Sequence, residues 1–197
     1  MAGRASSVWQ ALVGRDDSWS DVVARYAEPV RVHHTLDHVE EVLATLDELG
    51  TDDHAALLAA VLHDVVYDPT RSDNEAASAR YAQHVLAHLE AAVISRTTDL
   101  VLATAAHDPC PPDDRPRAAL LDADLAVLGE PPERYDRYAA GIREEYRHVP
   151  EDAFRAGRRA VLEGFLARPR LFLTGLVHDR CEASARRNLR REIERLG

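Results

Sequence analysis

Lysine is absent from the sequence: all 24 basic residues among its 197 are arginine. Such a chain cannot supply a Schiff-base amine, a lysine general base or the phosphate-binding lysine of a P-loop, which excludes those three classes of enzyme. The 34 acidic residues outnumber the arginines and give a net charge of −10. Since the arginines are scattered along the chain, this charge repels nucleic-acid backbones and anionic lipid, and we expect neither a nucleic-acid polymer nor a membrane as a partner.

Cysteine and long apolar runs are also scarce. Cys110 and Cys181 are too few and too far apart for a thiolate metal site or a disulfide scaffold, which favours a reducing compartment. No uninterrupted apolar run approaches the roughly 18 residues of a membrane-spanning helix. The segment 1–14 has no apolar run of signal-peptide length. We therefore expect a cytoplasmic protein.

Apolar residues recur at helical rather than strand spacing, and no segment shows a convincing alternation. We predict an all-α fold with about nine or ten helices separated by glycine- and proline-containing turns. The short apolar run Leu171–Leu173 follows Pro169, and we interpret it as the opening of another helix. The clearest helical pattern is that of Val39, Val42, Leu43 and Leu46.

The length fits one domain over residues 1–197. The segment 108–116, rich in proline and aspartate, would suit a linker between two helical halves, but a surface loop of this length is also ordinary.

Ten histidines in an acidic chain suggest a search for a metal site, because imidazole and carboxylate together suit divalent transition metals. The dipeptide His-Asp occurs three times where random order gives roughly one, so the dipeptide alone is a weak signal. The first copy follows the apolar segment 57–62, and burying its carboxylate is costly unless a cation or a hydrogen bond compensates the charge. The three copies are His63-Asp64, His107-Asp108 and His178-Asp179.

Two further regions could complete a site with His63. His34 and His38 stand four residues apart and share a face if both are helical. If the helix begins only near Leu36, His38 alone is helical. Downstream, Asp122 and Asp124 interrupt an apolar helical run. Residues two apart on a helix point about 200° from each other, so only one of these carboxylates can face the ion.

These pieces together resemble the His…His-Asp…Asp signature of the HD superfamily of metal-dependent phosphohydrolases. The resemblance is carried by His38, the segment 60–64 and the segment 123–125. It is closest to a small bacterial group described as predicted HD-superfamily phosphohydrolases, which usually has tyrosine where this chain has His33. The remaining matching segments cover most of the chain from Tyr26 onward: 31–38, 66–67, 74–75, 121–125, 143–146, 157–158 and 185–189.

The resemblance implies an HD-like helical bundle with additional C-terminal helices and a divalent ion, which could be Mn, Mg, Fe, Ni, Co or Zn. Its ligands would be His38, His63, Asp64 and Asp124. The superfamily's last aspartate usually lies in an Ala-Asp-x-Leu setting, of which this chain keeps the Ala-Asp pair at Ala123 and Asp124. His107 lies where some HD enzymes place another histidine, for a second metal or for substrate.

The function that we expect is hydrolysis of a phosphate ester in a small molecule, with a nucleotide as an extrapolation from the superfamily. Asp64 would orient or deprotonate the attacking water, Arg31 would hold a phosphoryl oxygen, and Glu75 or His107 would assist proton transfer. His34, His107 and Asn74 are candidates for contacts with substrate or a second metal. Structural roles stay open: Arg31 could be an ordinary paired arginine, and Glu75 an acid favoured by a helix dipole.

Two other functions stay open. A di-iron HD-type oxygenase would need additional histidines, and His34 and His107 are available. A non-enzymatic helical sensor would bind a nucleotide or metal and report to a partner. A homo-oligomer is compatible with either function.

Overall fold

The protein is described from a computed structural model that covers residues 3–14 and 16–197. Within these residues the regular structure is entirely helical and includes ten α-helices, which confirms the predicted all-α class. Their order along the chain is α1 (Arg4–Leu12), α2 (Asp16–Tyr26), α3 (Leu36–Glu48), α4 (His54–Leu62), α5 (Asn74–Val85), α6 (Ala91–Ala103), α7 (Arg115–Leu125), the 3₁₀ helix η1 (Ala126–Gly129), α8 (Pro132–Glu145), α9 (Glu151–Ala167) and α10 (Gly175–Leu196).

The chain divides into two compact units, a first unit of residues 1–124 and a second unit of residues 125–197. Each is described separately, and the expectation of a single domain stays a prediction. No helix in the described ranges is both long enough and apolar enough to cross a membrane.

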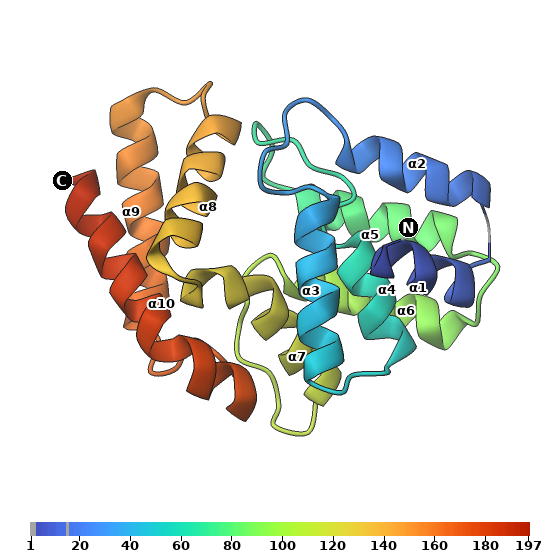
Figure 1. Ribbon diagram of the computed structural model, residues 1–197. Helices are drawn as coiled ribbons and strands as arrows, with labels where there is room; N and C mark the ends of the chain where they lie inside the picture. The colour runs from blue at the N-terminus through green and yellow to red at the C-terminus, as the bar shows by residue number, and fades with distance from the viewer. Residues whose placement is uncertain (1–2, 15) are drawn as a thin grey trace. The chain divides into compact units, whose positions relative to one another are not determined.

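Helix α4 is the centre of the first unit. Its alanines and leucines are the strongest helix formers, and the Asp53 carboxylate caps its start by accepting a hydrogen bond from the Ala56 amide at 2.9 Å. Every residue from Ala55 to Leu62 is buried, because α4 contacts α1, α3, α5 and α6 (Figure 1). A helix that is apolar on all sides is stable only when neighbours enclose it. His63, the next residue, is therefore delivered into the interior.

Helix α3 presents the apolar stripe that its sequence predicts, with Val39, Val42, Leu43 and Leu46 in the core. The helix begins at Leu36, so His34 lies before it while His38 lies in its first turn on the buried face. The two histidines therefore do not share a helical face. Of the two helix starts left open by the sequence, the one near Leu36 is confirmed.

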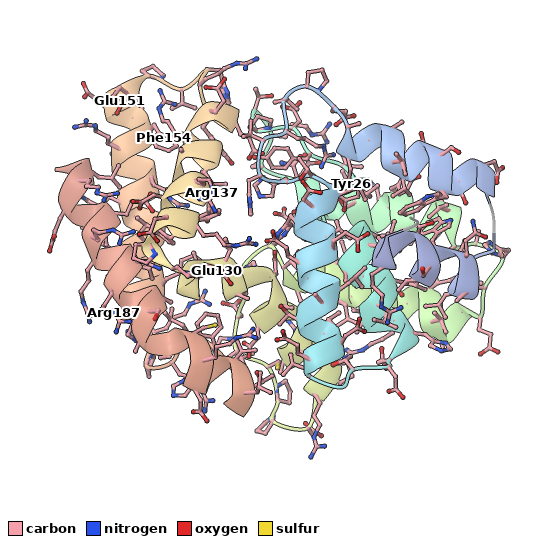
Figure 2. All side chains as sticks on the ribbon, viewed as in Figure 1. Tyr26, Glu130, Arg137, Glu151, Phe154 and Arg187 are labelled. Carbon is pink, nitrogen blue, oxygen red and sulfur yellow. The ribbon has the colours of Figure 1, made fainter. Side chains whose placement is uncertain are left out.

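The second unit is built from η1 and the helices α8, α9 and α10. Fifteen of the 24 arginines lie in it, so they are less evenly scattered than the sequence analysis assumes, but 12 of the 34 acidic residues offset them. In one such pairing, Arg143 donates to Glu151 at 3.0 Å, and its guanidinium lies 4.6 Å from the ring centre of Phe154 (Glu151 and Phe154 are labelled in Figure 2).

A buried polar network joins the three helices of the second unit. Arg158 donates two hydrogen bonds to the Glu192 carboxylate, at 2.8 and 3.2 Å, and the Tyr135 hydroxyl donates to the same carboxylate. Pairing of this kind offsets part of the cost of removing both charges from water.

The interpretation of Leu171–Leu173 as the opening of a helix is wrong. These residues precede α10, which begins at Gly175. The amides of Leu171 and Phe172 donate instead to the Glu182 carboxylate, at 3.0 and 3.3 Å, so a side chain replaces the helical hydrogen bonds.

Gly129 at the end of η1 tests the packing of the second unit. A Cβ there would lie 2.8 Å from the Cα of Cys181 and would collide with its Cβ. We expect Gly129→Ala to lower the free energy of unfolding by about 1–3 kcal/mol. Gly157→Ala is the matched control, because nothing lies within 4 Å of a Cβ at that helical position, and it should be neutral or stabilise by up to about 1 kcal/mol. Equal stability of both variants in denaturant unfolding would contradict this packing.

Candidate metal centre

Three helix ends of the first unit bring imidazoles and carboxylates together. His38 comes from the first turn of α3, His63 and Asp64 follow the last residue of α4, and Asp124 lies near the end of α7. A fifth residue, His107, comes from the turn after α6. We call the first four residues the metal cluster.

The potential ligand atoms of the metal cluster lie at contact distance. His38 Nε2 is 3.0 Å from Asp124 Oδ1 and 3.3 Å from His63 Nε2, and His63 Nε2 is 3.5 Å from the same carboxylate oxygen. Asp64 Oδ2 lies 3.0 Å from His63 Nε2 and 4.0 Å from His38 Nε2. Ligand atoms about 2.0–2.2 Å from a common ion stand about 3–3.5 Å from each other. The spacing thus suits a divalent cation, and His38, His63 and Asp124 together could hold one.

The tautomer of neutral His63 suits a metal ligand. Its Nδ1 lies 3.0 Å from the backbone carbonyl of Ala60, and a carbonyl oxygen can only accept a hydrogen bond. Nδ1 therefore carries a hydrogen, which leaves the Nε2 lone pair of the neutral ring directed at the cluster. A hydrogen bond from the second ring nitrogen to a carbonyl is the usual arrangement behind a metal-ligating histidine.

The charges of the cluster are strongly coupled. Burial acts to lower the pKa of His63, but the charges of Asp64 and Asp124 outweigh it and raise this pKa well above its ordinary value. Burial alone would raise the pKa of Asp124, whereas the charge of His63 and hydrogen bonds from His107 and His38 hold it well below its ordinary value. Without a metal, a proton on His63 therefore neutralises part of the buried negative charge.

The structure separates Asp124 from Asp122. Asp122 is 1% exposed and does not belong to the metal cluster. Its charge acts elsewhere: after burial and the charge of Asp114, it contributes to the raised pKa of the Cys110 thiol. The two carboxylates thus point in different directions, as their spacing on a helix requires.

His107 has a strained backbone and contacts the cluster. Its φ of 50° lies in the left-handed region, which is uncommon for residues other than glycine. Its Nε2 lies 2.8 Å from Asp124 Oδ2, the carboxylate oxygen that is not directed at His38. Strained conformations of this kind persist where surrounding contacts fix them, often at functional sites.

The expected role of Arg31 as a phosphate ligand needs correction. Its side chain has no solvent exposure. The guanidinium donates to the backbone carbonyls of His34, Asp64 and Val65 and to the Glu28 carboxylate, at 3.0, 2.7, 3.2 and 3.3 Å. These bonds occupy most of its five donors, so the group has no face left for a phosphate.

Asn74 likewise has a structural partner where sequence analysis expects substrate or a metal. Its side-chain amide donates to the Asp68 carbonyl and accepts from the Asp68 amide, at 2.9 and 3.0 Å. One turn along α5, the Ser78 hydroxyl makes the equivalent pair of bonds to the backbone of Val66. Sequence analysis missed Ser78, because its partners are backbone groups that no motif marks.

Glu75 lies in the first turn of the same helix. By helical spacing it shares the face that carries the buried Ser78, Ala79 and Ala82, and it is half-buried. Within the described residues its carboxylate makes no hydrogen bond or ion pair, so its proposed part in proton transfer stays a prediction.

Two more histidines, His33 and His34, lie before α3 and place their rings near His38. The ring centre of His33 is 4.7 Å from that of His38, and the ring of His34 stacks on Tyr67 at 4.3 Å. The ring centre of His34 also lies 6.1 Å from that of His38, beside the cluster. Although burial alone would raise the pKa of Asp64, the charges of His63 and His34 lower it. Sequence analysis gave no role to His33, whose imidazole stands where the resembling group has tyrosine.

A surface cavity of about 380 Å³ opens next to the turn that follows Asp64. No residue of the metal cluster lines it. Its walls include Arg25, Glu28, Tyr67 and Arg71.

Comparisons of the chain with models of known protein families, with curated proteins and with solved structures find no match. The resemblance to the HD superfamily therefore rests on the residues named above.

The raised pKa of His63 predicts a proton-coupled metal affinity. Below that pKa an incoming ion must displace the His63 proton, so affinity for Co²⁺ should rise about tenfold per pH unit and level off above it. Without metal, the stability of the fold changes with pH in the opposite direction. The stabilisation from protonated His63 is present at low pH and is lost as pH rises through the folded-state pKa. Calorimetric titration at neutral pH in two buffers of different ionisation enthalpy should count about one released proton. Release of none would contradict the protonation of His63.

Proposed function

We propose that the protein is a metal-dependent phosphohydrolase of the HD superfamily, acting on a phosphate ester of a small molecule, with nucleotides as the first class to test. The observation that supports this proposal best is the metal cluster itself. Two nearly buried imidazoles, 4% and 2% exposed, face two carboxylates whose described side-chain partners are histidines rather than arginines. Such a donor set in an apolar surrounding calls for a cation.

The residues that would hold a divalent ion are His38, His63, Asp64 and Asp124. When bound, the ion would lower the pKa of a water molecule and offset charge on the phosphoryl oxygens. Asp64, whose side chain is 14% exposed, would orient that water towards phosphorus. The water oxygen forms the new bond to phosphorus, and the ester oxygen leaves as an alcohol after it receives a proton.

Residues around the cluster would divide the remaining tasks. His107 or Glu75 would supply the proton for the leaving oxygen. Because the donors of Arg31 are occupied by backbone carbonyls, we assign the contact with phosphate to His34. The charge of His34 lowers the pKa of Asp64, and its ring stacks on that of Tyr67.

A di-iron oxygenase is the second candidate. Asp124 directs Oδ1 at His38 and Oδ2 at His107, so a second ion beside His107 would share this carboxylate with the first. Metal analysis of the purified protein would distinguish the two candidates, because the oxygenase requires two redox-active irons and the phosphohydrolase does not.

The decisive experiment combines metal analysis with a phosphate-release screen over nucleotides and sugar phosphates. We expect turnover that requires a divalent ion. Asp124→Asn should weaken metal binding by more than the roughly 10- to 100-fold typical of groups that only orient a ligand, and should reduce activity in step with occupancy. Glu75→Ala should keep the ion and lower turnover by about 10²- to 10⁴-fold if Glu75 transfers the proton.

Asp122→Asn is the matched control, since it alters a buried carboxylate on the same helix outside the cluster. It should retain both metal and activity. Loss of metal in the Asp122 variant alone would refute the assignment of Asp124. A wild-type protein that binds metal but releases no phosphate from any member of the screen would refute the phosphohydrolase proposal and favour a sensor or an oxygenase.

A further inference from the structure

Arg31 connects the two chain segments that carry the imidazole ligands. Its Nη1 donates to the carbonyl of His34, in the segment that enters α3, and to the carbonyl of Asp64, after α4. Its Nη2 donates to the carbonyl of Val65. One guanidinium thus joins the segment before α3 to residues that lie 33 and 34 positions after Arg31 in the sequence.

The surroundings of the guanidinium fix its orientation. Its carbon lies 4.9 Å from the ring centre of Tyr26 and 5.4 Å from that of Tyr67, and Glu28 supplies a carboxylate partner. The Tyr26 hydroxyl donates to the carbonyl of Val61, in the last turn of α4 (Tyr26 is labelled in Figure 2). A cation at the carbonyl-rich end of a helix is favourable, because the final carbonyls of the helix lack partners within it.

The turn after Asp64 is held from two sides. Ser78 and Asn74 attach Val66 and Asp68 to α5, while Arg31 attaches Asp64 and Val65 to the segment before α3. The α5 contacts fix the far part of the turn. The Arg31 contacts act on the residue that carries the carboxylate.

We propose that Arg31 is a positioning residue of the metal cluster: by holding the Asp64 and His34 carbonyls together, it fixes the direction of the Asp64 carboxylate relative to His38. A planar group with donors in a fixed arrangement suits this task, and a lysine ammonium, a single charged centre, does not. The inference rests on the proposed function only in that the cluster must bind a metal ion.

The test uses Co²⁺ as a probe, because its visible absorption reports the geometry of its ligands. Arg31→Gln should weaken Co²⁺ binding by about 10- to 100-fold and change the absorption spectrum, as expected when a group that orients a ligand is lost. The matched control is Arg158→Gln, which removes another nearly buried arginine, 9% exposed and paired with Glu192, from the second unit. It should lower thermal stability but leave Co²⁺ affinity and spectrum unchanged.

A second pair of variants keeps the proposal testable if Arg31→Gln does not fold. If Arg31→Gln is unfolded, Arg31→Lys and Arg158→Lys retain the charges, and only the former should weaken Co²⁺ binding and alter its spectrum. A folded Arg31 variant with wild-type affinity and spectrum would overturn the positioning role. Absence of Co²⁺ binding by the wild-type protein would overturn the metal centre and this role with it. Metal binding without phosphatase activity would refute only the proposed function.

Discussion

The buried negative charge of Asp64 and Asp124 is the constraint on which the organisation of the first unit depends. Removing an ionised carboxylate from water costs several kcal/mol even after relaxation, and these two lie within 3.5 Å of His63 Nε2. A proton on His63 offsets part of that charge, and a divalent cation would offset more. This buried charge arises because the enclosed apolar helix α4 delivers His63 and Asp64 to the interior. The contacts of His38 and His107 with Asp124 help to compensate the charge of that carboxylate.

Several residues outside the four residues of the metal cluster hold the cluster in place. Arg31, Ser78 and Asn74 satisfy the backbone of the turn from Asp64 to Asp68, which would otherwise leave polar groups unpaired in a largely buried place. The left-handed conformation of His107 costs on the order of 1–3 kcal/mol, a cost that glycine would avoid. Its persistence is explained by the contact of the imidazole with Asp124, so local strain and the functional hypothesis agree.

The sequence is most informative about the site where a polar residue follows an apolar run, because a charge in that context has few structural explanations. A His-Asp pair at the end of an apolar run predicts a buried charge, and this predicts the site around His63 from local pattern alone. Periodicity does not decide between Asp122 and Asp124, since both carboxylates are largely removed from solvent and the choice depends on what packs against each side of α7. The roles of Arg31 and Asn74 could not be predicted either, because their partners are backbone carbonyls and amides brought near only by the fold. Leu171–Leu173 failed for the same reason: the Glu182 carboxylate that replaces helical hydrogen bonding belongs to the next helix.

The central claim is that His38 and His63 present their Nε2 atoms to one divalent ion. Nitrogen-15 NMR of the histidine rings during titration with Zn²⁺ tests it most directly, because the chemical shift distinguishes a protonated, a free and a metal-bound ring nitrogen. The account predicts metal-bound Nε2 resonances for both histidines and a protonated Nδ1 for His63, which stays bonded to the Ala60 carbonyl. Zn²⁺ bound through Nδ1 of His63, or bound with both Nε2 resonances unchanged, would contradict it.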